Sequence, residues 1–227
     1  MKKIVTYILF VSVALVSCTS EEQINEQDKT LLKKYEIKKD AQGKYSIDYK
    51  VEESSTVEVI KNYENNFNEI HLHDGKVAMK QDYSQGLNIE NDQLKIGFFE
   101  NGSNKRTIII EDENIVLAKK SEFEGKRSSP YLESYSITDL GNNEYELNFV
   151  TTNGVSVVFN YNENTHIYEI HLKPLGTNIN SNTYSKSYVK SEDILQIDFI
   201  NYVNSSSTKN SETYLENDKV PRVIIRD

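Results

Sequence analysis

The chain contains one cysteine, no tryptophan, two methionines and only three prolines among its 227 residues. With Cys18 as the single thiol, the protein cannot form an intramolecular disulfide or a zinc site built on several cysteines. Its stability must therefore come from an ordinary apolar core. Acidic residues outnumber basic ones, 35 to 26, for a formal net charge of −9. This sign is wrong for a phosphate-backbone partner, and we expect no nucleic-acid binding.

The motifs of common enzyme classes are also missing. The chain has no Gly-x-Ser-x-Gly, no His-Glu-x-x-His and no phosphate-binding glycine loop. Many carboxylates are present, but their spacing singles out no catalytic pair. The acidic run Glu111-Asp112-Glu113 lacks the Asp-x-Asp-x-Asp-Gly pattern of a calcium loop. We therefore expect a protein that is not an enzyme and that needs no cofactor.

The most specific pattern is at the N-terminus. Lys2 and Lys3 precede an apolar run that is too short for a stable transmembrane helix and is typical of a secretory signal. The run continues through Leu15-Val16-Ser17 to Cys18. This segment resembles the lipobox of bacterial lipoproteins. The following Thr19-Ser20-Glu21-Glu22 is similar to the polar, acidic signal of surface-exposed lipoproteins in the Bacteroidetes.

The resemblance implies that residues 1–17 are a signal peptide and that Cys18 is the lipid-attachment site. In that family the cysteine thiol is diacylated and the new N-terminus is usually acylated as well, with fatty acids such as palmitate. Several acyl chains give stable anchoring, whereas a single chain is marginal. The resemblance places the protein in the cell envelope, anchored by lipid to the outer membrane. It favours the cell surface over the periplasmic side.

The rest of the chain predicts a tether and an all-β body. Residues 18–33 are polar and charged, and we expect a tether with a turn or two of helix near Leu31-Leu32. From about Tyr35 apolar and polar residues alternate, as in strands that have one face buried and one face exposed to solvent. No window of a dozen residues has apolar residues at the spacing of an amphipathic helix. Turn pairs such as Asp74-Gly75 separate the runs and indicate antiparallel sheets. The runs expected as strands are 45–51, 57–60, 70–72, 77–79, 94–98, 107–110, 115–117, 131–137, 145–150, 155–161, 167–172, 194–200 and 223–225.

The second half of the chain repeats the first. Between residues 37–72 and 137–172 eight positions are identical at a shift of 100, including Glu69-Ile70-His71-Leu72 and Glu169-Ile170-His171-Leu172. Residues 108–112 correspond to residues 223–227 at a larger shift of 115, because the second half carries an insertion before this segment. We interpret this as a duplicated β unit, with unit 1 over 34–119, a linker over 120–130 and unit 2 over 131–227. Both two sandwiches in series and one fused sheet or barrel satisfy the pattern.

Two sets of side chains are candidate sites. Glu69, His71 and His73 lie at i, i+2 and i+4, on one face of a strand, where they could bind zinc or form a carboxylate-oriented imidazole. A polar outer face with nothing bound explains them as well, and we expect no metal. Fifteen tyrosines suit glycan stacking, although tyrosine is also a favoured strand residue. Those near polar segments are Tyr131, Tyr135, Tyr184, Tyr188, Tyr202 and Tyr214, of which Tyr202 and Tyr214 lie in a Ser- and Asn-rich insertion over 201–219.

The sequence is compatible with three functions. The first is a non-catalytic binding or assembly module of the envelope, with a glycan or protein ligand bound near the insertion and a sheet edge. The second is a periplasm-facing carrier or structural lipoprotein of the outer membrane. The third is a metal-dependent hydrolase that uses Glu69, His71 and His73. The sequence favours the first function.

Overall fold

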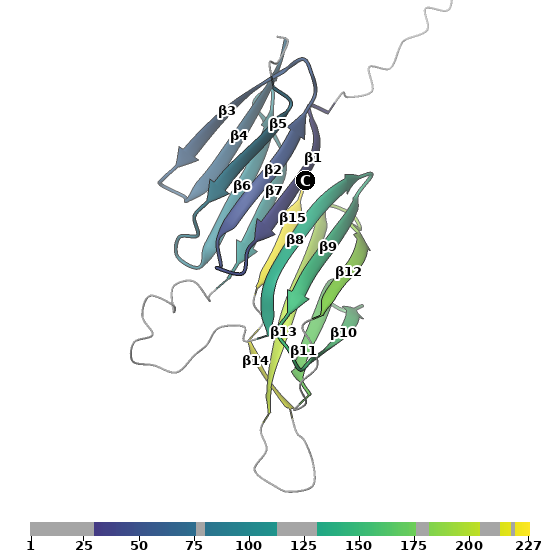
Figure 1. Ribbon diagram of the computed structural model, residues 1–227. Helices are drawn as coiled ribbons and strands as arrows, with labels where there is room; N and C mark the ends of the chain where they lie inside the picture. Colours follow the sequence, from purple (N-terminus) through teal and green to yellow (C-terminus); the bar gives the residue numbers. More distant parts are fainter. Residues whose placement is uncertain (1–29, 76–79, 113–130, 176–181, 205–213, 219–220) are drawn as a thin grey trace, which may run out of the picture.

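The computed structural model describes residues 30–75, 80–112, 131–175, 182–204, 214–218 and 221–227, and their regular structure consists of β-strands (Figure 1). The predicted all-β fold is confirmed. Within these ranges, no helix is long and apolar enough to cross a membrane. Cys18, the predicted strands at 77–79 and 115–117 and the predicted linker lie outside the described residues.

The strands of the first half are β1 (Leu32–Lys39), β2 (Tyr45–Val51), β3 (Ser55–Asn62), β4 (Phe67–Asp74), β5 (Asp82–Leu87), β6 (Gln93–Glu100) and β7 (Ser103–Glu111). Those of the second half are β8 (Leu132–Gly141), β9 (Glu144–Thr151), β10 (Val155–Asn162), β11 (Ile167–Pro174), β12 (Thr183–Val189), β13 (Ile194–Asn204), β14 (Tyr214–Asp218) and β15 (Arg222–Arg226).

Both sheets run through both halves of the chain. The six-stranded sheet has the order β12-β9-β8-β1-β2-β5. The nine-stranded sheet has the order β10-β11-β13-β15-β7-β6-β4-β3, and β14 pairs with β13. Neighbouring strands are antiparallel except for β4–β6 and β11–β13, which are parallel. The two halves are therefore joined edge to edge in two open sheets, and they are not two sandwiches in series.

In each sheet, the strands of the two halves follow the same order when each half is counted from its outer edge inward. From the outer edge inward, β5-β2-β1 matches β12-β9-β8, and β3-β4-β6-β7 matches β10-β11-β13-β15. At the two junctions Ile37 lies opposite Ile137 and Ile109 lies opposite Ile224, and these residues match at the sequence shifts of 100 and 115. A strand that pairs antiparallel with its own counterpart in this register defines an approximate twofold axis. Figure 1 shows β1 and β8 adjacent at this junction.

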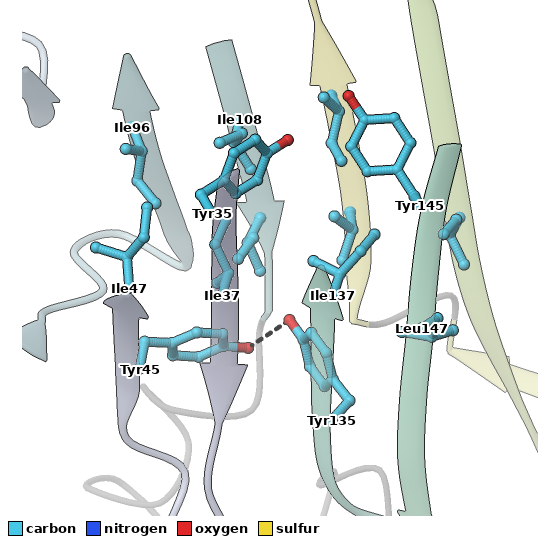
Figure 2. Close-up of a cluster of buried hydrophobic side chains, with 14 of the residues drawn as sticks. Tyr35, Ile37, Tyr45, Ile47, Ile96, Ile108, Tyr135, Ile137, Tyr145 and Leu147 are labelled. Atoms are coloured by element: carbon cyan, nitrogen blue, oxygen red, sulfur yellow. Dashed lines mark hydrogen bonds between the residues drawn. The ribbon is translucent and has the colours of Figure 1, made fainter. Parts of the chain in front are cut away.

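The core lies between the two sheets. Alternate residues of each strand point inward, as the period-two pattern predicts. Figure 2 shows Ile37 and Ile137 at the centre, with Tyr35 and Tyr145 on one side and two further tyrosines on the other. The fully buried side chains include Tyr35, Ile37, Ile47, Ile70, Leu72, Leu94, Ile96, Phe98, Ile108, Tyr145, Phe149 and Phe199.

The structure corrects the predicted start of the body. Leu31 is buried and β1 begins at Leu32, so the predicted turn of helix there is wrong and the β body begins before the predicted boundary at residue 34. The backbone N–H groups of Leu31 and Leu32 donate hydrogen bonds to Glu100 Oε1, at 3.1 and 2.9 Å. Because Glu100 is itself buried, its carboxylate needs such donors, and it holds this segment in the sheet.

The insertion over 201–219 is also more regular than a loop. β13 continues to Asn204, and β14 returns alongside it, so Tyr202 pairs with Glu216 and Asn204 pairs with Tyr214. Residues 205–213 lie outside the described ranges. The edge strands β5 and β12 are absent from the predicted list, because each has few apolar residues for its length.

Candidate functional site

Two hollows lie on the outer face of the six-stranded sheet, which is turned away from the core. The larger one, groove 1, has a volume of about 490 Å³ and crosses β1, β2 and β5. The smaller one, groove 2, has a volume of about 310 Å³ and crosses β8, β9 and β12 next to the end of β1. Since β8, β9 and β12 are the counterparts of β1, β2 and β5, the grooves occupy equivalent places in the two halves.

The strand alternation determines which side chains line each groove. Tyr35 and Tyr49 point into the core, so their neighbours along β1 and β2 point outward into groove 1. The same alternation on β8 and β9 supplies groove 2. The outward residues of groove 1 on these two strands are Lys34, Glu36, Asp48 and Lys50, and their equivalents in groove 2 are Ser134, Ser136, Asn148 and Val150. Groove 1 is thus charged, whereas groove 2 is mainly neutral.

Lys38 lies between the two grooves. Its Nζ is 2.9 Å from Glu36 Oε2 and 2.7 Å from Asp48 Oδ2 in groove 1, and its side chain also lines groove 2. The hydrogen bond from Lys38 is the largest cause of a lowered pKa at Asp48, and the hydrogen bond to Asp48 is the largest cause of a raised pKa at Lys38. Both groups are therefore ionised at neutral pH.

Basic side chains surround the remainder of groove 1. Lys34, Lys50 and Lys80 are exposed along it, with Asp82 as the remaining acidic side chain of its lining. The Lys80 ammonium lies 5.2 Å from the centre of the Tyr83 ring, and that ring stacks on Tyr49 at 5.2 Å. The lining of groove 1 contains three lysines and three carboxylates, and Lys38 beside it brings the local charge to +1, in a chain whose overall charge is negative.

The predicted Glu69, His71 and His73 set lies on the outer face of the other sheet, on β4. His71 Nε2 is 2.9 Å from Glu69 Oε2, so the carboxylate orients the imidazole as the spacing suggests. The His71 ring stacks on Phe99 at 4.7 Å and lies 6.3 Å from the His73 ring. Among the described residues, no group of three or more His, Cys, Asp or Glu side chains is placed to hold a metal ion. These three side chains share a face without forming such a group.

The second half contains a related arrangement that includes Tyr202. His171 Nε2 lies 3.2 Å from Glu169 Oε2, and its Nδ1 lies 2.8 Å from the Tyr202 hydroxyl. The Tyr202 ring stacks on His171 at 5.6 Å, and Lys173 Nζ lies 4.9 Å from its centre. Partial burial opposes ionisation of Glu169, but hydrogen bonds from Asn160, Asn162 and His171 outweigh it, so the Glu169 pKa is lowered. The Tyr202 ring is therefore in contact with His171 and Lys173 of the same chain.

The other tyrosines selected from the sequence do not form a site. Tyr135 and Tyr188 are buried in the core, Tyr131 and Tyr184 are half-buried, and the Tyr214 side chain lies outside the described part. The two grooves are absent from the sequence-based candidates. Their only sequence signal is the row of outward polar residues along each strand, which does not show where a sheet is hollowed.

A buried polar cluster crosses the junction between the halves, and we call it the Asp112 cluster. Asp112 is fully buried, and its Oδ2 accepts hydrogen bonds from Lys39 Nζ at 2.5 Å and from the Tyr45 hydroxyl at 2.7 Å. The Tyr45 hydroxyl is in turn 3.1 Å from that of Tyr135, across the junction (Figure 2). The cluster joins the two sheets through β1 and Asp112, and it joins the two halves through Tyr135.

A second cluster, the Arg106 cluster, also joins the halves. Arg106 forms ion pairs with Asp139 and with Asp227, the latter at 2.8 Å, and Lys190 pairs with Asp227. The pKa of Asp227 is lowered because its hydrogen bond from Lys190 and the charge of Arg106 outweigh its partial desolvation. Both clusters hold the halves in a fixed relation, so the spacing of the two grooves is fixed as well.

Comparison with models of protein families, with curated proteins and with solved structures finds no match to this chain. We therefore infer the function from the geometry of the grooves and from the sequence of the N-terminal segment.

Proposed function

We propose that the protein is a lipid-anchored component of the bacterial cell envelope that binds a glycan without catalysis, through grooves 1 and 2. The observation that carries this proposal is the presence of two hollows at equivalent places on one sheet face. The lipobox-like segment ending at Cys18 supports attachment to the outer membrane, with the sheets displayed at the cell surface.

The chemistry of the grooves suits a sugar. Groove 2 offers hydroxyl and amide groups from Ser134, Ser136, Asn148 and Thr183, which donate and accept hydrogen bonds as sugar hydroxyls do. Both hollows are broad and lie on a strand surface, so a bound ligand remains partly hydrated, whereas apolar cofactors favour enclosed pockets. The lysines of groove 1 add affinity for acidic sugars. We therefore expect a glycan with both neutral and acidic residues.

A set of glycan-array measurements on the full-length protein tests this proposal. Lys50→Glu reverses a charge in groove 1, and Lys44→Glu makes the same change at an exposed position in the β1–β2 turn, outside both grooves. Lys50→Glu should weaken retention of acidic oligosaccharides at least tenfold, and Lys44→Glu should leave it within about twofold. The proposal is overturned if no oligosaccharide is retained or if both variants weaken retention equally.

The anchor needs a separate test. Cells that express the protein should incorporate labelled palmitate into it, and Cys18→Ser should abolish the label. External protease should degrade the protein on intact cells if it is displayed at the surface. Protection from protease until the outer membrane is opened would instead support the periplasm-facing structural or carrier lipoprotein.

A further inference from the structure

The nine-stranded sheet ends in two equivalent edge strands, β3 and β10. Each has eight residues, and within the described ranges each pairs on one side only, β3 with β4 and β10 with β11. Neither strand contains proline, and the pairing of β10 with β11 runs from Val155 to Asn162 without a register shift. Both edges therefore present regular, extended backbone with one side open.

The two edges differ in charge. β3 carries Glu58 and Lys61, whereas the equivalent positions of β10 are Val158 and Tyr161. As a result β10 has no charged residue over Val155–Asn162, and it exposes 51% of Val158, 36% of Phe159 and 39% of Tyr161. Charged side chains, lysine above all, are the usual protection of a sheet edge against pairing with another strand. The β3 edge keeps this protection and the β10 edge lacks it.

The exposed side chains of β10 lie on both of its faces. Phe159 lies opposite Ile170 and shares the core-facing side, where its ring is 6.1 Å from that of Phe149. Val158 lies opposite His171 on the outer face. An added strand along β10 would satisfy its open backbone groups and cover apolar side chains on both faces.

We propose that β10 pairs antiparallel with β10 of a second copy of this chain, so that two nine-stranded sheets continue into each other. Antiparallel pairing of identical strands is self-complementary and closes as a twofold dimer. The chain already contains two such associations, since β1 pairs with its counterpart β8 and β7 with its counterpart β15. Because β10 itself has no charged residue, two copies with a net charge of −9 can pair along it without like charges on the paired strands, and the Lys186 ammonium, 5.6 Å from the Phe159 ring, adds a positive charge beside the edge.

Sedimentation velocity of the full-length protein tests this dimer, with variants of matched exposure. Val158→Glu restores the charge found at Glu58 of β3. Leu140→Glu makes the same kind of change at the end of β8, where Leu140 is 49% exposed. The wild-type chain and Leu140→Glu should dimerise alike at micromolar concentration, and Val158→Glu should raise the dimer dissociation constant at least tenfold. Val158→Lys, with the opposite charge, should behave as Val158→Glu does.

Hydrogen exchange supplies a readout that is independent of the variants. Amides of β10 that point to its open edge should become more protected as the concentration of the wild-type chain rises, while those of β3 should not change. A wild-type chain that stays monomeric overturns the proposal, even if an extended peptide of another protein then covers β10. A dimer that is unaffected by both Val158 variants, or equally weakened by Leu140→Glu, also overturns it.

Discussion

Replacing Asp112 with asparagine should destabilise the protein far more than removing any exposed acidic group. Asp112 is fully buried and receives the Lys39 ammonium at 2.5 Å and the Tyr45 hydroxyl at 2.7 Å. Lys39 is itself only 8% exposed, so Asp112→Asn leaves a buried positive charge facing a neutral amide. Such a charge cannot regain its hydration without opening the junction between the halves.

The size of the effect follows from burial. Breaking a buried ion pair by removing one partner costs about 3–5 kcal/mol, or roughly two to four orders of magnitude in the folding equilibrium constant. The chain supplies a matched control, because Asp48 pairs with Lys38 at a similar distance, 2.7 Å, with side chains about 40% exposed. Asp48→Asn should cost only about 0–1 kcal/mol.

Urea unfolding of both variants, followed by far-ultraviolet circular dichroism, measures the difference. Asp112→Asn should lower the free energy of unfolding by about 3–5 kcal/mol with an unchanged slope, against at most about 1 kcal/mol for Asp48→Asn. Adding Lys39→Met to Asp112→Asn removes the unpaired charge and should recover most of the loss. Equal small losses for the two asparagine variants would show that the buried ion pair does not stabilise this junction.

Two further predictions concern the buried tyrosines and one glycine. Burial raises the pKa of Tyr49 and Tyr145 to about 12, against 10 in the unfolded chain, so the stability that they contribute is complete below pH 10 and falls as the pH rises toward 12. Urea unfolding between pH 9 and 12 should show this loss, and a constant free energy of unfolding would contradict it. Gly97→Ala should cost about 1–3 kcal/mol, because a Cβ there would lie 2.7 Å from the Phe67 ring. Gly86→Ala, with open space around it, should cost nothing, and thermal melts of the two variants distinguish these outcomes.

Much of the fold can be predicted from the sequence, because strands with one buried and one solvent-exposed face show alternating apolar and polar residues. The alternation at 45–51 and 145–150 gives β2 and β9, and the repeat at a shift of 100 anticipates that the halves have the same strand order. The edge-to-edge pairing of the two halves cannot be predicted from the sequence, because Ile37 and Ile137 at the junction are as apolar as any other core residue. Their pairing depends on two sheets closing over a shared core.

The candidate sites are less predictable from the sequence than the strands are, for a physical reason. Glu69 and His71 do meet, since neighbours on one strand face are placed by backbone geometry alone. Grooves 1 and 2 combine outward residues from three or more strands, and their depth depends on how the sheet twists and curves. The edge strands β5 and β12, which complete the grooves, have weak patterns of their own and are held by pairing with β2 and β9.

The most direct measurement of the proposed function is a map of where a glycan binds. Hydrogen exchange and amide chemical shifts of the full-length protein should be recorded with and without the oligosaccharide that the array selects. We expect changes on the outward residues of β1, β2, β5, β8, β9 and β12, at both grooves and in both halves. Changes confined to the nine-stranded sheet, near Glu69–His71 or Glu169–His171, would contradict it and would place the binding site on the opposite face of the protein.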